Sequence, residues 1–117
     1  MKRIILISLI LSITLVFYAH AQDQTALEER LTYLNDIPEI SWVEFDGNDV
    51  YIGFNKRPSD LGSIVRGAAA FGNKAYGFGV HVWAVPAAEK GWRPGKGSNS
   101  YCSATGRYGK VEKSNCR

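Results

Sequence analysis

One strand-like stretch carries the side chains best suited to chemistry. In AYGFGVHVWAVP (75–86), Phe78 and Val80 alternate with His81 and Trp83, so we expect the first pair in the core and the second pair on the opposite face of a strand. An imidazole titrates near neutral pH and can act as a general base, whereas an indole ring can stack on a sugar or a nucleobase. The stretch therefore indicates either an active site or a binding face.

The active-site hypothesis is a small secreted hydrolase or nuclease that uses His81 as its base. Such a site needs cations that stabilise a developing anion and polar groups that assist the base. The candidates are Arg66, Lys74, Arg93 and Arg107 as cations, and Glu44 and Tyr51 as assisting groups. No nucleophile elbow, phosphate-binding loop or zinc-binding histidine pair accompanies them. We therefore favour a protein without catalytic residues, metal or cofactor, and keep the hydrolase as an alternative.

The binding hypothesis is an aromatic surface. Alternation places Tyr51 on the same sheet face as His81 and Trp83, and either Trp42 or Val43 joins them, depending on strand register. The predicted binding residues, which include three from the following tail, are Tyr51, His81, Trp83, Trp92, Arg93 and Tyr101. Two outcomes stay open: the face is exposed to a partner, or the tail (87–117) folds over it and makes a second core.

Four segments are predicted to position these residues. TALEERLTYLNDIP (25–38) places leucines at i, i+4 and i+7 and predicts a helix, whereas EISWVEFDGNDVYIGF (39–54) predicts a β-hairpin. Residues 57–75 predict a second helix, and 75–86 a third strand. This order, α-β-β-α-β, predicts an α+β fold in which two helices pack on one face of a small three-stranded sheet that further strands could extend.

The two ends of the chain set the predicted domain boundaries. Residues 1–21 have a basic start, an apolar run and an Ala-x-Ala site, which is the pattern of a signal peptide cleaved after Ala21. The alternative is that this run is retained as an anchor. A core domain over 22–88 and a basic, Gly-rich C-terminal segment over 89–117 follow, and no second apolar run predicts a transmembrane segment in the mature chain.

The chain has two cysteines, Cys102 and Cys116. An even count in an exported chain favours a disulfide, and free or redox-active thiols are the alternative. Closing a loop of about 15 residues would contribute roughly 3 kcal/mol to stability. We therefore predict that a disulfide closes the C-terminal segment as an appendage to the core domain, within which residues 101–105 and 108–113 could pair as a short hairpin around Gly106.

Charge is distributed unevenly along the chain. Residues 22–60 contain nine acidic and three basic residues, whereas residues 61–117 contain nine basic and two acidic residues. Either the two halves attract each other, or the second half offers a basic face to an anionic partner.

These observations predict a small exported, noncatalytic binding protein that acts in the periplasm, at the cell envelope or outside the cell. Its partner is expected to be anionic, such as a lipid headgroup or an envelope glycan, or to be a protein. Peripheral membrane contact is compatible with this prediction, and a nucleic acid is not favoured. A further alternative is an inhibitor or accessory protein of an exported enzyme, with Trp92 and Arg93 at its contact surface.

Overall fold

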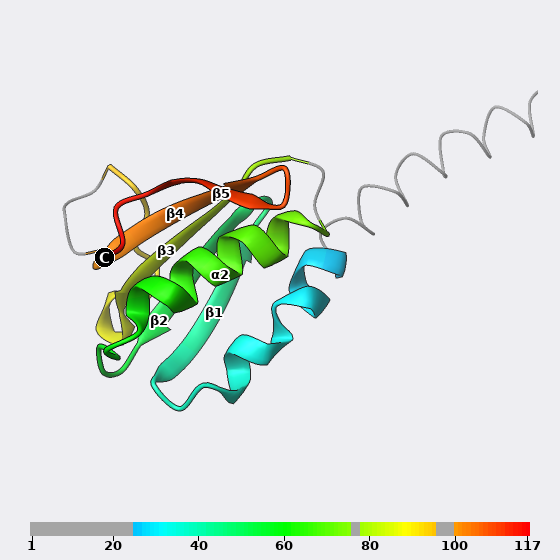
Figure 1. The fold of residues 1–117 in the computed structure, drawn as a ribbon. Helices are drawn as coiled ribbons and strands as arrows, with labels where there is room; N and C mark the ends of the chain where they lie inside the picture. The colour runs from blue at the N-terminus through cyan, green and yellow to red at the C-terminus, as the bar shows by residue number, and fades with distance from the viewer. Residues whose placement is uncertain (1–24, 76–77, 96–99) are drawn as a thin grey trace, which may run out of the picture.

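The computed structural model describes residues 25–75, 78–95 and 100–117, and its described strands form one mixed five-stranded sheet (Figure 1). The strands lie in chain order across the sheet: β1 (Ile40–Asp46), β2 (Asp49–Phe54), β3 (Val80–Pro86), β4 (Cys102–Arg107) and β5 (Lys110–Ser114). Neighbouring strands are antiparallel except β2 and β3, which are parallel. A parallel pair needs a crossover connection, and helix α2 (Leu61–Asn73) supplies it.

The helices cover one face of this sheet. Residues 25–30 are helical, and the short 3-10 helix η1 (Thr32–Asp36) continues the chain after a break at Leu31. Figure 1 shows this N-terminal segment lying beside α2 on the same side of the sheet. Arg30 joins the two, since its Nε donates to the carbonyl oxygen of Phe71 at 2.9 Å. The single helix expected over 25–38 is therefore interrupted, but its position on one sheet face is confirmed.

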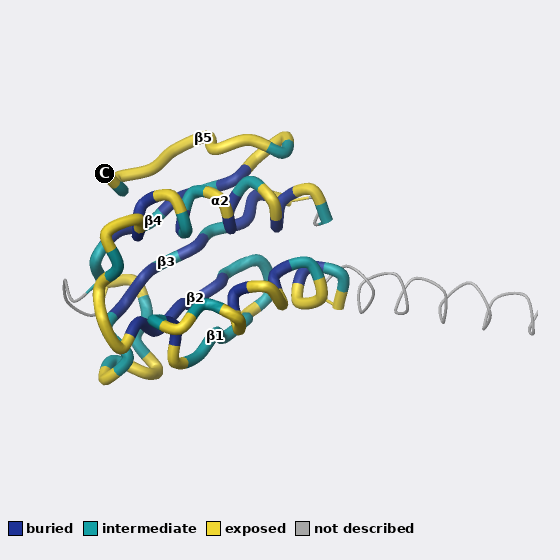
Figure 2. Tube along the Cα trace, turned by 60° about the horizontal axis from the view of Figure 1, so that its bottom comes forward, coloured by how far each residue is buried: buried dark blue, intermediate teal, exposed yellow. Residues whose placement is uncertain are grey.

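The core lies between the sheet and the helices. Its members are the apolar residues that alternation and helical spacing selected: Leu27, Leu31 and Leu34 from the N-terminal segment, Val50, Ile52 and Phe54 from β2, and Val80, Val82 and Ala84 from β3. All nine are almost fully buried, and Figure 2 shows β2 and β3 as the most buried strands while β5 is exposed along its length. The two-residue periodicity of the strands and the spacing of the leucines therefore select side chains of the same core.

The C-terminal segment differs from the prediction, because it extends the sheet. The expected three-stranded sheet and the order α-β-β-α-β are wrong in stopping at β3, since β4 and β5 add two antiparallel strands. Gly106 makes this possible: a Cβ atom at Gly106 would collide with the backbone oxygen of Ala69, so only glycine lets α2 pack this closely on β4. The α+β class and the Cys102–Cys116 disulfide are confirmed.

Predictions about the leader fall outside this description. The signal peptide and its cut after Ala21 lie within residues 1–24, which are not among the described residues. Within 25–75, 78–95 and 100–117, none of the helices has the length and apolar character needed to cross a membrane.

Candidate functional site: an aromatic cluster on the open sheet face

Tyr51 lies at the centre of a ring cluster on the sheet face that the helices leave open. It is opposite Trp83 in the parallel β2–β3 register, and the two rings stack with centroids 5.3 Å apart and planes 15° apart. The guanidinium carbon of Arg93 lies 4.3 Å above the Tyr51 ring. With Trp92 meeting it edge-on at 6.3 Å, Tyr51 is only 2% exposed. Tyr51 is therefore buried beneath the side chains of Trp83, Trp92 and Arg93.

A loop after β3 brings Trp92 and Arg93 onto the sheet. The loop begins with the 3-10 helix η2 (Ala87–Glu89). The backbone N–H of Trp92 then donates to the Glu89 carbonyl oxygen at 2.9 Å, which turns the chain. Arg93 then pairs with two carboxylates of β1, at 3.8 Å from Glu44 and 3.9 Å from Asp46. The loop covers part of the aromatic face, and the charge of Arg93 is balanced there.

Strand register decides between Trp42 and Val43. Trp42 is opposite Gly53, and its indole ring occupies the space that a side chain at Gly53 would need. Its Nε1 donates to the Ala87 carbonyl oxygen at 3.0 Å. Val43 instead packs against the core. Trp42 therefore belongs to the open face and fixes the start of the loop over it.

His81 and Trp83 form the part of the cluster nearest β4. Both are half-buried, and their ring centroids are 5.8 Å apart. Trp83 stacks on Tyr51, and its ring centroid is 6.5 Å from that of Trp92. Its neighbour in the β3–β4 register is the small residue Ser103. His81 Nδ1 is 3.0 Å from the hydroxyl of Thr105, and among the described residues this is the only hydrogen bond of the ring. Trp83 and His81 are therefore the residues of the cluster placed to meet a ligand over β4.

Carboxylates border the cluster on its β1–β2 side. Asp49 lies between the two neighbouring strands, opposite His81 in the β2–β3 register and opposite Asp46 in the β1–β2 register. Burial raises the pKa of Asp49 above its ordinary value, Asp46 raises it further, and the attraction of His81 and Arg93 partly opposes the rise. Burial also raises the pKa of Tyr51. This border therefore contains the three carboxylates Glu44, Asp46 and Asp49, and the cation Arg93 is paired with the first two.

The structure brings five of the six predicted binding residues together. Tyr51, His81, Trp83, Trp92 and Arg93 share the cluster just described. Tyr101 lies elsewhere, because it precedes β4 and packs against the core, with the Arg57 guanidinium carbon 5.3 Å from its ring centroid.

Of the four cations named for the hydrolase alternative, Arg93 joins the aromatic cluster that contains His81, where it is paired with Glu44 and Asp46. The other three have their contacts elsewhere. Arg66 lies on α2 and donates to the Cys116 carbonyl at 2.9 Å, and Arg107 pairs with Glu112 at 2.9 Å. Lys74 lies past the end of α2 against Gly109. No group of histidine, cysteine, aspartate or glutamate side chains within the described ranges could hold a metal ion.

Sequence reasoning missed Ser103, Thr105 and Asp49. The first two were missed because the pairing of β4 with β3 was not predicted, although CSATGR alternates buried and less buried positions once α2 covers it. Asp49, within the predicted hairpin 39–54, was not singled out, yet it begins β2 opposite His81. No protein-family model, curated protein or solved structure matches this chain.

Proposed function

We propose that this is an exported, noncatalytic binding protein whose open sheet face holds a neutral sugar unit of an envelope or extracellular glycan. The observation that carries the proposal is the half-buried Trp83 ring, which stacks on Tyr51 and whose neighbour in the β3–β4 register is the small residue Ser103. A ring held by stacking is a rigid platform, and sugar rings present apolar C–H faces to such platforms. The leader pattern and the disulfide support export.

Polar groups around Trp83 suit a hydroxyl-rich ligand. The hydroxyls of Ser103 and Thr105 both donate and accept, the second ring nitrogen of His81 is free of any hydrogen bond in the described structure, and Asp49 can accept from a sugar hydroxyl. The indole Nε1 of Trp92 is buried and has no hydrogen-bond partner in the described part of the chain. An unpaired buried donor costs roughly 1–3 kcal/mol. A ligand oxygen that reaches Trp92 would recover that free energy.

Charge favours a neutral ligand at this face. Glu44, Asp46 and Asp49 border it, and Arg93 is already paired with the first two. An anionic polymer would meet these carboxylates at short range, which is unfavourable. The anionic partner expected from the overall charge pattern therefore fits this face poorly. The inhibitor alternative also finds no support, because Trp92 and Arg93 pack on the sheet.

The test is a titration with neutral trisaccharides, followed by the three indole N–H resonances in NMR spectra. Probes are the trimer of N-acetylglucosamine, maltotriose and cellotriose, with trigalacturonate as the anionic comparison. We expect one neutral probe to shift the Trp83 signal, with an affinity that stays constant between 50 and 500 mM NaCl because no charge pairing is involved.

The decisive variant is Trp83→Leu, which keeps an apolar side chain and removes the platform. Stacking of a base on an aromatic ring contributes roughly 1–3 kcal/mol, and we expect a sugar ring on Trp83 to gain a similar free energy, so affinity should fall at least about fivefold. Phe71→Leu is the matched control, because Phe71 is a partly exposed aromatic residue on α2, on the other side of the sheet. Unchanged affinity of Trp83→Leu, or shifts produced by trigalacturonate alone, would overturn the proposal.

A further inference from the structure

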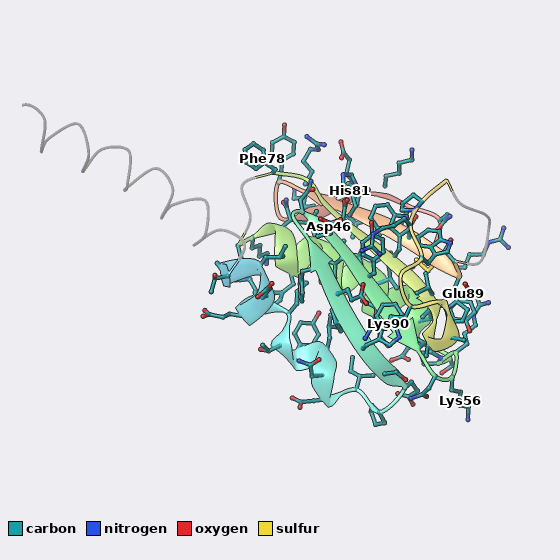
Figure 3. All side chains as sticks on the ribbon, turned by 180° about the vertical axis from the view of Figure 1, so that it is seen from behind. Asp46, Lys56, Phe78, His81, Glu89 and Lys90 are labelled. Carbon is teal, nitrogen blue, oxygen red and sulfur yellow. A yellow bond between two sulfur atoms is a disulfide. The ribbon has the colours of Figure 1, made fainter. Side chains whose placement is uncertain are left out.

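A second aromatic surface lies at the end of the sheet where β3 begins and β4 ends. We call Lys74, Phe78, Arg107 and Tyr108 the tip surface. These residues line one open groove of about 420 Å³ together with Asn73, Gly79 and Gly109. Phe78 is 64% and Tyr108 is 89% exposed, more than any other large apolar side chain of the described residues. Figure 3 shows Phe78 at the end of the molecule opposite Lys56.

The backbone of Tyr108 makes this exposure unusual. Tyr108 has φ 57° and the next residue, Gly109, has φ 70°, so the β4–β5 turn has the left-handed geometry of a type I′ hairpin. That geometry favours Asn-Gly, and a bulky residue at positive φ is strained by roughly 1–3 kcal/mol. Tyr108 therefore combines an exposed ring with an unfavourable backbone conformation. Neither feature stabilises the fold, which points to a role at the surface.

One buried side chain holds the two aromatic residues in place. Asn73 is 8% exposed, its Nδ2 donates to the Phe78 carbonyl at 2.6 Å, and its Oδ1 accepts from the Gly109 N–H at 2.8 Å. It is the buried polar residue of the described core, and it ties the start of β3 to the β4–β5 turn. The tip surface is therefore rigidly built at the end of α2.

The tip surface is cationic, unlike the aromatic cluster. The Lys74 side chain lies against Gly109, the Arg107 guanidinium lies against Gly79, and Lys110 closes the turn. Glu112 pairs with Arg107 at 2.9 Å, which leaves the charges of the two lysines uncompensated by that carboxylate. Exposed aromatic rings beside cations match the water–lipid interface of an anionic bilayer, where rings enter the headgroup region and cations contact phosphates.

We infer that the tip surface docks the protein on an anionic lipid bilayer, with Phe78 and Tyr108 entering the interface and Lys74 and Lys110 facing the lipid phosphates. The contact is peripheral and reversible, since two rings and a few cations bury little surface. The inference does not depend on saccharide binding, because the two surfaces share no residue.

The experiment is co-sedimentation with vesicles, using protein purified after export whose N-terminus is established by mass. One vesicle set is pure phosphatidylcholine, and the other is an equal mixture of phosphatidylcholine and phosphatidylglycerol. We expect binding to the anionic vesicles alone, and we expect it to weaken from 50 to 500 mM NaCl because exposed charges are screened. Equal binding to both vesicle sets would overturn the inference.

Two double variants test whether the contact is made by the tip surface and the adjoining Lys110. Phe78→Ser with Tyr108→Asn should lower the partition coefficient at least about tenfold, and Lys74→Gln with Lys110→Gln should lower it about fivefold per lysine. The control is Tyr33→Ser with Phe71→Ser, which removes an edge-to-face aromatic pair of 40% exposure each from the helical layer. Tyr108→Asn alone, which suits the turn better, keeps the test valid if Phe78→Ser impairs folding.

The outcomes separate this inference from the proposed function. Trp83→Leu should sediment with anionic vesicles as the parent does, and the tip variants should bind the trisaccharide as the parent does. If the tip variants and the control lose vesicle binding equally, or if the tip variants bind like the parent, the inference is wrong, whatever the sugar titration shows.

Discussion

Aromatic residues serve opposite purposes on the open sheet face and at the tip. On the sheet face they pack on one another, and Tyr51 is 2% exposed; at the tip the side chains are largely exposed, Phe78 at 64% and Tyr108 at 89%. Their surroundings differ in sign as well, with carboxylates beside the cluster and lysines beside the tip. The difference shows that burial, rather than residue type, decides whether an aromatic side chain supports the fold or is available to a partner.

The largest test of this contrast compares two tyrosines. Tyr51→Ala removes a buried ring that contacts Trp83, Trp92 and Arg93, and should lower the free energy of unfolding by about 3–5 kcal/mol. Tyr108→Ala removes an exposed ring and should change it by less than about 0.5 kcal/mol. Urea unfolding followed by circular dichroism measures both. Similar losses of unfolding free energy at the two sites would show that the buried and the exposed tyrosine contribute equally to stability, and the comparison would be wrong.

The disulfide should have the next largest effect. Cys102 and Cys116 join the start of β4 to the segment after β5, across a loop of about 15 residues, so Cys102→Ser with Cys116→Ser should cost roughly 3 kcal/mol. The tip lies at the other end of the β4–β5 hairpin, and vesicle binding should persist while the variant stays folded. Thermal unfolding with and without reductant gives the stability change, and the parent under reductant should match the variant. A loss below about 1 kcal/mol would mean that the β4–β5 ladder alone holds the segment.

The same substitution at two glycines should have opposite signs. Gly53→Ala places a methyl group where the Trp42 ring lies and should cost about 1–3 kcal/mol, with a shifted Trp42 indole signal. Gly67→Ala meets open space on the exposed side of α2 and should stabilise the protein by about 1 kcal/mol through helix propensity. Chemical unfolding of both variants checks the pair. Equal effects would show that Trp42 is not held against the sheet.

Tyr108→Asn should raise stability while it weakens membrane contact. Asparagine accepts the left-handed conformation of this turn position at lower cost than tyrosine, so the free energy of unfolding should rise by about 1 kcal/mol. A melting temperature that rises together with weaker vesicle binding would show that the strain serves the surface. A lower melting temperature would show that the Tyr108 ring stabilises the fold.

Much of the fold was predictable because its signals are local. Alternation in β2 and β3 and the leucine spacing of the N-terminal segment each need only neighbouring residues, and they located the core. A short hairpin over 101–105 and 108–113 was considered, but its place in the sheet was not predicted, because the pairing of β4 with β3 depends on Ala104 and Gly106 fitting beneath α2, which is a tertiary contact. All five residues of β5 are exposed, so no apolar pattern indicates its place at the edge of the sheet.

The candidate site was predictable to the same extent. Tyr51, His81 and Trp83 were placed on one face because alternation is a property of each strand. The hydrogen bond of His81 comes from Thr105 on β4, and the pairing of β4 with β3 was not predicted. Phe78 was expected in the core, and this was wrong, because β3 begins at Val80 and the alternation does not extend to residue 78. The tip surface was missed because it joins the end of α2 to a turn that only pairing with β3 positions.

The smallest expected effect concerns the charge beside the cluster. Burial raises the pKa of Asp49, so the folded protein holds this proton more tightly than the unfolded chain, and the contribution of Asp49 to stability falls as the pH rises through its raised pKa. Asp49→Asn should therefore raise the melting temperature at pH 7, by at most about 2 °C for a partly exposed group, and leave it unchanged at pH 3, where the carboxyl is protonated in both states. Melting curves of parent and variant at the two pH values measure the difference. A variant less stable at pH 7 would mean that the attraction of His81 and Arg93 outweighs burial. A more stable variant would show that the sheet face keeps this carboxylate at a cost to folding, as the tip keeps Tyr108, and would support a role for Asp49 in ligand binding.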